Sequence, residues 1–281
     1  MSSSASSSSS PPSIDPTLHK PRILCLHGGG TNTRIFRAQC RVLERRLEST
    51  FRLCYAEAPF ASQPGPDVVS VYKDYGPFKA WLRWTAEDPY PDANSAIERI
   101  TDALLTAMDE DDRRGATGEW VGLLGFSQGA KICASLLYMQ QAHQEQGLYG
   151  WARDWPNFHF AVLLAGRGPL ISLMPDVPVP RGLVSASEPA STAAVDDRSR
   201  IPATDLVKIP TIHLHGLQDP GLYLHRRLLH DYFDMRQVRL LEWDGGHRVP
   251  IKTKDVNPLI QEMISIAAET GVVWGSEFDW P

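Results

Sequence analysis

The stretch WVGLLGFSQGAKICASLLYMQQ, residues 120–141, decides the fold. Its first part, 120–125, is mostly apolar and predicts a buried strand, and AKICASLLYMQQ has a helical pattern. Between them lies GFSQG, residues 125–129, which matches G-x-S-x-G. A strand, a tight turn and a helix in this order hold Ser127 on a strained elbow, with its hydroxyl above the carboxyl edge of a sheet. We therefore predict a nucleophilic Ser127; the alternative is a glycine-flanked turn with an inert serine.

The rest of the chain repeats the same alternation of short β-rich apolar runs and longer helical patterns from Pro21 onward. Several of the runs are continuously hydrophobic, which is typical of strands covered on both faces. Alternating β and α units predict an α/β fold with a mostly parallel sheet flanked by helices. The predicted strands are 22–26, 51–56, 120–125, 159–164, 211–214 and 238–243, and the predicted helices lie near 33–49, 92–110, 128–145, 222–235 and 255–270.

Two residues after Ser127 have the positions expected of its partners. A serine hydroxyl is a poor nucleophile until a base takes its proton, and in this architecture the acid and the histidine follow the serine in that order. Asp219 follows a strand within TIHLHGLQDP, and His247 follows the next strand within DGGHRVP. We predict Ser127, His247 and Asp219 as nucleophile, general base and imidazole-orienting acid. The competing acids are Asp231 and Asp234, within a helical pattern, and Asp244, too close in sequence to His247.

A glycine run, Gly28–Gly30, follows the first predicted strand. An acyl-transfer intermediate carries an oxyanion that needs N–H donors fixed in advance. We predict that the N–H groups of Gln128 and Gly29 form this oxyanion hole, with Gly30 as the alternative to Gly29. A phosphate-binding loop is the competing interpretation, but the run lacks the Lys-Ser/Thr of a P-loop and the spacing of a dinucleotide fingerprint.

The other histidines have structural interpretations. His213 and His215 share one face of a strand, so a metal pair is conceivable, but without a Cys or carboxylate cluster we predict buried core histidines. His225 and His230 lie in a helical pattern and are predicted to be surface residues. His27 precedes the glycine run and is predicted to shape that loop.

Residues 60–90 interrupt the α/β alternation and contain seven aromatic residues without a clear strand. Loops of this length in a compact domain are usually functional or disordered. We interpret the segment as a cap whose aromatic residues bind substrate, in particular Tyr75, Phe78, Trp81 and Trp84. Trp81 and Trp84 are three residues apart and would share one face of a helix; the alternative is that they anchor that helix to the core.

A second interruption, 167–205, is rich in Pro, Ser and Asp and is either a mobile flap or a solvated insertion. The serine tract that begins the chain cannot bury enough surface to order itself, so residues 1–20 are predicted to be a disordered tail. We predict one domain over 21–281, with insertions at about 60–90 and 167–205.

The composition excludes several classes of protein. With 28 basic and 33 acidic residues in 281, the formal charge is −5, which offers no attraction to nucleic acid or to an anionic membrane. No apolar stretch is long enough to predict a membrane span. The four cysteines form no C-x-x-C pair, so we predict buried thiols and a cytoplasmic location.

Five motifs in order now give a family resemblance: LCLHGGGTN, YGPFKAWLRW, GFSQGA, HGLQDP and GGHRVP. Together they resemble the fungal serine-hydrolase family with an α/β-hydrolase fold, which includes the yeast family serine hydrolases and the human ovarian-cancer-associated hydrolase. The resemblance covers about residues 20–270. The tryptophan-containing cap is most similar to the branch found in fungal polyketide gene clusters, such as the lovastatin-pathway thioesterase.

The resemblance implies a serine hydrolase that cleaves an acyl thioester or ester and releases a polyketide acid from the acyl carrier domain of a polyketide synthase. Carried over by motif, its triad falls on Ser127, Asp219 and His247. No metal or organic cofactor is implied, because the chemistry needs only the triad, water and the oxyanion donors. The alternatives are a broad carboxylesterase acting on small lipophilic esters and a non-catalytic small-molecule receptor.

Overall fold

Six parallel strands form the central sheet of the computed structural model, which describes residues 15–85, 87–146, 155–190 and 200–272. The order across the sheet is β2-β1-β5-β6-β7-β8. All six predicted strands are present, with ends shifted by at most two residues: β1 (Arg22–Leu26), β2 (Arg52–Ala56), β5 (Trp120–Phe126), β6 (Phe160–Leu164), β7 (Thr211–Gly216) and β8 (Val238–Trp243). The predicted fold class, an α/β-hydrolase fold, is confirmed.

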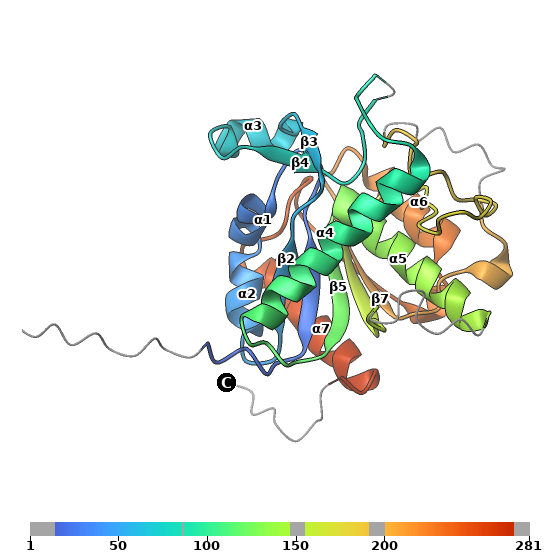
Figure 1. Ribbon diagram of the computed structural model, residues 1–281. Coiled ribbons are helices and arrows are strands. Elements are labelled where there is room, and N and C mark those ends of the chain that lie inside the picture. Colours follow the sequence, from blue (N-terminus) through green and yellow to red (C-terminus); the bar gives the residue numbers. More distant parts are fainter. Residues whose placement is uncertain (1–14, 86, 147–154, 191–199, 273–281) are drawn as a thin grey trace, which may run out of the picture.

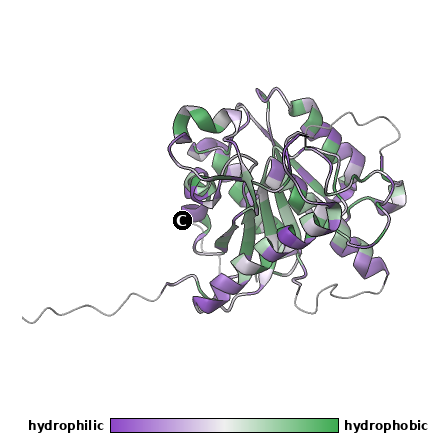
Figure 2. Cartoon of the chain, turned by 45° about the horizontal axis from the view of Figure 1, so that its top comes forward, coloured by the Kyte–Doolittle hydropathy of each residue, from purple (hydrophilic) through white to green (hydrophobic). Residues whose placement is uncertain are grey.

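Helices cover both faces of this sheet (Figure 1). Side chains of α4 (Ala93–Arg113), α5 (Gln128–Glu145) and α6 (Leu222–Tyr232) belong to one apolar cluster, and those of α1 (Thr33–Gln39), α2 (Arg41–Leu47) and α7 (Thr253–Glu269) belong to a second. Within β1, Leu24 and Leu26 join the first cluster, and Ile23 and Cys25 join the second. Both faces of the strand are therefore buried, which explains its continuous hydrophobic sequence. Figure 2 shows the apolar strands between helices whose outer faces are polar.

The order of the strands determines where the site forms. The chain passes from β1 to β2 in one direction across the sheet and then, from β5 to β8, in the other. The reversal lies between β1 and β5, and the crevice outside the carboxyl ends of such neighbours is where α/β sheets bind ligands. The loop after β1 contains the glycine run, and the loop after β5 is Ser127. Both predicted elements of the site thus meet at the switch point.

Two of the expected elements differ in the structure. The helix predicted near 33–49 is divided at Cys40 into α1 and α2. The segment 60–90, predicted to have no strand, contains a small antiparallel sheet of β3 (Phe60–Ser62) and β4 (Phe78–Ala80), with α3 (Pro66–Tyr72) between them. These elements lie together at the top of Figure 1. The sequence does not predict these strands, because each has only three residues, too few for a period-2 pattern.

The insertion 167–205 is neither a flap nor merely solvated in its described part, 167–190 and 200–205. Leu170, Ile171 and Leu173 are buried in the first apolar cluster, and Ile171 forms a bridge with Val184. Residues 191–199 lie outside the described residues. This segment therefore contributes to the core.

The structure differs from the predicted disordered tail, residues 1–20, at residues 15–20, which make ordered contacts. Residues 1–14 lie outside the described residues, whereas the backbone of Leu18 accepts a hydrogen bond from Thr117, and Asp15 forms an ion pair with Arg52. The contacts tie residues 15–20 to the edge of the sheet. In the described part of the chain, no helix is both long and apolar enough to cross a membrane.

Candidate active site

The turn after β5 holds Ser127 in a backbone conformation that side chains rarely adopt, with φ of 54°. The turn is possible because two glycines flank it. A Cβ on Gly125 would lie 2.6 Å from the backbone of Ala130, and a Cβ on Gly129 would lie 2.1 Å from the carbonyl oxygen of Leu26. Strand and helix therefore pass too closely for any other residue. The structure thus contains the strained elbow predicted from G-x-S-x-G.

The structure brings Ser127, His247 and Asp219 into one chain of hydrogen bonds. Ser127 Oγ lies 3.0 Å from His247 Nε2, and His247 Nδ1 lies 2.6 Å from Asp219 Oδ2. His247 comes from the loop after β8 and Asp219 from the loop after β7, so all three residues lie at the carboxyl edge of the sheet. The competing acid Asp244 is exposed and contacts Gln218 instead. A hydroxyl, an imidazole and a carboxylate in this order can transfer a proton from the serine.

Asp219 is buried and surrounded by hydrogen-bond donors. Its Oδ1 accepts a hydrogen bond of 2.7 Å from the N–H of Gly221, and the guanidinium of Arg167 lies 3.7 Å away. Burial would raise the pKa of Asp219, but the hydrogen bonds with His247 and His225 outweigh it and hold the pKa well below its usual range. The group is therefore an ionised carboxylate at neutral pH.

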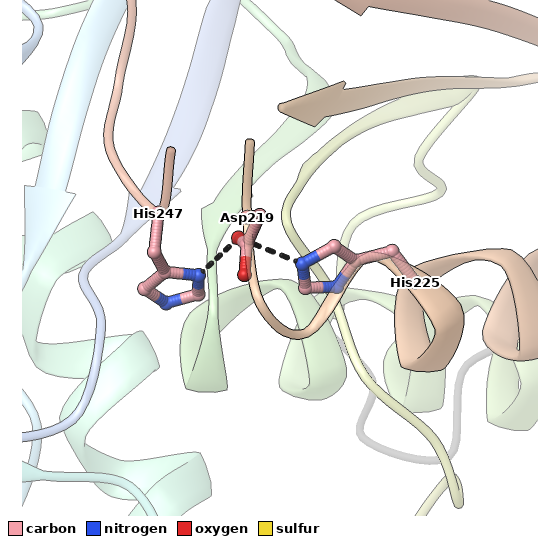
Figure 3. A group of neighbouring side chains, drawn as sticks. All are labelled: Asp219, His225 and His247. Carbon is pink, nitrogen blue, oxygen red and sulfur yellow. Dashed lines mark hydrogen bonds and ion pairs between the residues drawn. The ribbon is translucent and has the colours of Figure 1, made fainter. Parts of the chain in front are cut away.

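His225 was missed as a member of the site and wrongly expected at the surface. It is buried in the first turn of α6, and its Nε2 lies 2.9 Å from Asp219 Oδ2. Figure 3 shows the two imidazoles on either side of the carboxylate. His230, further along α6, is exposed as expected. Asp219 thus has two histidine partners.

The glycine loop lies against the start of α5. The N–H of Gly30 donates to Lys79 O at 2.8 Å, so this amide is occupied. By contrast, no hydrogen bond joins the N–H of Gly29 or of Gln128 to another described residue. His27 shapes the loop as expected, because its Nδ1 lies 2.7 Å from the carbonyl oxygen of Gly28 and 3.0 Å from Thr31 Oγ1. The geometry leaves Gly29 and Gln128 with N–H groups available near Ser127.

The side chain of Gln128 fixes the cap segment to the elbow. Its Oε1 accepts hydrogen bonds from the N–H groups of Trp81 and Leu82, at 2.7 and 3.1 Å, and its Nε2 donates to Leu82 O at 2.9 Å. The indole N–H of Trp81 donates to His27 O at 2.9 Å. The cap segment is therefore joined to the start of α5 through Gln128 and to the loop after β1 through Trp81.

The four predicted aromatic substrate contacts have different positions. Only Trp84 lines the cavity of about 770 Å³ beneath the small sheet. Trp81 is fully buried, with its indole N–H bonded to His27 O, and does not line the cavity. Tyr75 and Phe78 do not line the cavity either. Residues 81–84 form no helix, so Trp81 and Trp84 do not share a helical face.

The cavity lies next to the glycine loop. A Cβ on Gly29 would lie 2.8 Å from the indole of Trp84 and 2.9 Å from Gln128 Oε1. The cavity is lined by Phe60, Leu82, Trp84, Pro89, Tyr90 and Pro91, with Arg83, Asp88 and Arg99 among its polar residues. Neither this cavity nor a larger hollow of about 1130 Å³ along β2 and α4 is lined by Ser127, Asp219 or His247, and the lining of the larger hollow is rich in charged side chains. The cavity beside Trp84 is thus the better candidate for an apolar substrate group.

Three potential metal ligands, Asp219, His225 and His247, lie within 4.8 Å of one another. Their ligating atoms are already joined by hydrogen bonds of 2.6 and 2.9 Å, so an ion would have to replace those bonds. We interpret the group as a hydrogen-bonded network. His213 and His215 are buried as predicted, and burial lowers the pKa of His213 to about 3 and of His215 to about 4, so both are neutral.

Fold and site together define a serine hydrolase of the α/β-hydrolase class. Comparison with known families agrees, because residues 16–259 match the model of the serine hydrolase (FSH1) family. The chain belongs to that family and is an enzyme of the esterase type.

The chain is also similar to esterases and to solved structures. Esterase pigG of Monascus ruber is 59% identical over 93% of this chain and 96% of its own. Esterase dbaE of Emericella nidulans is 56% identical over 92% of this chain and 95% of its own. Among solved structures, Arabidopsis thaliana SOBER1 aligns with a TM-score of 0.48 at 14% identity, over 88% of this chain and 99% of that chain.

Proposed function

We propose that this enzyme hydrolyses an acyl ester or thioester through an acyl-enzyme, with Ser127 as nucleophile, His247 as general base and Asp219 as the acid that orients the imidazole. One observation carries the proposal: the unbroken hydrogen-bond chain from Ser127 Oγ through His247 to Asp219. Such a chain activates a hydroxyl that is otherwise unreactive at neutral pH.

The reaction follows from these contacts. As Ser127 Oγ attacks the acyl carbon, its proton passes to His247 Nε2, and the imidazolium that forms is stabilised by the ionised Asp219. The carbon–oxygen or carbon–sulfur bond then breaks, and the leaving alcohol or thiol takes the proton from His247. Water repeats the sequence on the acyl-enzyme, which yields a carboxylic acid and restores the serine.

The oxyanion of both tetrahedral intermediates is bound, in this proposal, by the N–H groups of Gln128 and Gly29. Their availability supports this role, and the engaged N–H of Gly30 argues against the alternative donor. Two fixed donors act on the charge as it develops, without reorganisation.

The acyl group occupies the cavity beside Trp84, whose volume of about 770 Å³ and aromatic lining suit a bulky apolar chain. The names of the relatives support an ester as substrate. The resemblance of the cap motif to the polyketide-cluster branch supports a more specific substrate, a polyketide acyl thioester on an acyl carrier domain. A cytoplasmic location fits such a partner.

The substrate proposal is tested with matched acyl thioesters and oxygen esters of increasing acyl length. We expect kcat/KM to rise with acyl length and to be highest for a thioester presented on an acyl carrier domain. A flat profile with a preference for short oxygen esters would instead indicate a broad carboxylesterase. Failure of a fluorophosphonate probe to label the protein would indicate a receptor.

Two tryptophan variants separate the cavity from its support. Trp84→Ala should lower kcat/KM for long acyl groups by about tenfold and leave short acetyl esters unchanged, because a short group does not reach the indole. Trp81→Ala should reduce activity at every acyl length and destabilise the fold by about 3–5 kcal/mol, since this ring is buried and hydrogen-bonded to His27. The measurements are kcat/KM along the length series and thermal melting of each variant. If Trp84→Ala lowered kcat/KM equally at every acyl length, the acyl group would not bind in this cavity.

A further inference from the structure

His225 is fully buried between the carboxylate of Asp219 and the main chain after β6. Its Nε2 lies 2.9 Å from Asp219 Oδ2, and its Nδ1 lies 2.9 Å from the carbonyl oxygen of Gly166. In Figure 3 the imidazole approaches Asp219 from the side opposite His247. The proposed reaction does not use this residue, although the same carboxylate oxygen contacts both histidines.

The hydrogen-bond chemistry of these contacts determines the direction of donation. A carbonyl oxygen and an ionised carboxylate are acceptors only, so any hydrogen bond here must be donated by the imidazole. A neutral imidazole has one N–H, and the charged acceptor forms the stronger bond. His225 therefore donates from Nε2 to Asp219 when neutral, and when protonated it donates to Gly166 as well.

Several charged or titratable groups face His225. Burial lowers the pKa of His225, while the hydrogen bonds to Asp219 and Gly166 act to raise it. Arg167, after β6, also lowers it, and two further imidazoles lie close: His215 of β7 at 5.7 Å between ring centroids and His247 at 6.0 Å. The Nε2 donor to Asp219 is present in either protonation state of His225.

We propose that His225 is a positioning residue: its Nε2–H holds Asp219 Oδ2 in place for His247 and shares the negative charge of that oxygen. The inference rests on the role of Asp219 in the proposed function. Two donors compete for Oδ2, so each weakens the bond to the other. His225 thereby limits how strongly the carboxylate stabilises the protonated form of His247, and so sets the pH at which the base becomes active.

The test compares His225→Leu with His225→Gln on an activated ester over a range of pH. In His225→Leu, Asp219 loses one donor and directs more of its charge to His247. We expect kcat to fall about tenfold with little change in KM, and the acid limb of kcat/KM to move about half a pH unit higher. Gln carries an N–H near the position of Nε2, so His225→Gln should restore the limb to within about 0.2 units of wild type.

A matched control removes another buried imidazole. His213 is as buried as His225 but packs on Phe233 and has no contact with Asp219. His213→Leu, followed by thermal melting and the same pH profile, should leave the acid limb in place. An equal shift in His213→Leu would overturn the proposal, as would an unmoved limb in a folded His225→Leu variant.

A double-mutant cycle separates this inference from the proposed function. In an Asp219→Asn background, His225→Leu should cause no further loss of kcat, because His225 acts through the carboxylate. If the kcat losses of Asp219→Asn and His225→Leu were additive in the double variant, the positioning role of His225 would be overturned and the proposed function would stand. If Asp219→Asn by itself retained wild-type kcat, the proposed function would fail, and the role of His225 with it.

Discussion

Replacing Ser127 by alanine should abolish ester hydrolysis, with a loss in kcat of about 10⁶-fold, and leave the fold intact. The substitution removes the hydroxyl that contacts His247 but no buried apolar group. Serine and alanine both carry a Cβ, so the backbone strain at φ of 54° is similar for the two residues. The substitution therefore does not alter the elbow. The measurement is turnover of an activated ester, together with thermal melting of both proteins.

Ser135→Ala is the matched control, since it removes a hydroxyl from α5, the helix that follows Ser127. Ser135 is buried, and its Oγ accepts a hydrogen bond of 3.0 Å from the N–H of Ile171, away from the catalytic hydrogen-bond chain. This variant should lose about 1 kcal/mol of stability and keep its turnover. Wild-type turnover in Ser127→Ala would show that the nucleophile lies elsewhere.

The second large effect is expected at Asp219. Asparagine has a similar shape, but it carries a donor where the carboxylate only accepts, and it favours the wrong imidazole tautomer. The aspartate oxygens accept from Gly221 and contact both His247 and His225, so an amide cannot satisfy all three partners. We expect Asp219→Asn to lower kcat by about 10⁴-fold.

Asp244→Asn provides the comparison for this variant. Asp244 is exposed and its carboxylate contacts only the side-chain amide of Gln218 among the described residues. Its substitution should change kcat less than about threefold. If Asp244→Asn lowered kcat more than Asp219→Asn did, Asp244 would be the acid that orients His247.

Sequence patterns predicted the sheet and the hydrogen-bond chain because both depend on local order. Continuous apolar runs identified the six parallel strands, and residues that follow such strands must meet at one edge. Ser127, Asp219 and His247 each lie within four residues of the end of a strand, so their proximity could be predicted without knowing any distance.

His225 could not be placed in the same way, because its contact depends on how α6 packs. A helical pattern shows which residues share a face but not what that face meets. One signal was present: His225 is three, four and seven residues before Leu228, Leu229 and Tyr232, all of which are buried. This spacing puts His225 on the apolar face of the helix. Burial was therefore predictable, but its partner Asp219 was not.

The aromatic segment shows a different limit. Its composition indicated a cap, but composition does not show which rings face a cavity. Trp81 is buried because its indole donates to His27 O and its main chain is bound by Gln128, and Trp84 lines the cavity. The difference arises from tertiary hydrogen bonds that no spacing rule contains.

The contact between Gln128 and the cap is made with main-chain groups of residues 81 and 82, so it does not depend on the side chains that line the cavity. Cavity residues such as Pro89 and Pro91 can therefore change without altering the position of the elbow. Under the proposed function, the acyl selectivity of this enzyme can change, by evolution or by design, while Ser127 keeps its position. A substitution of Gln128 would have a different effect, because a shorter side chain there would lose the hydrogen bonds that hold the cap to the elbow.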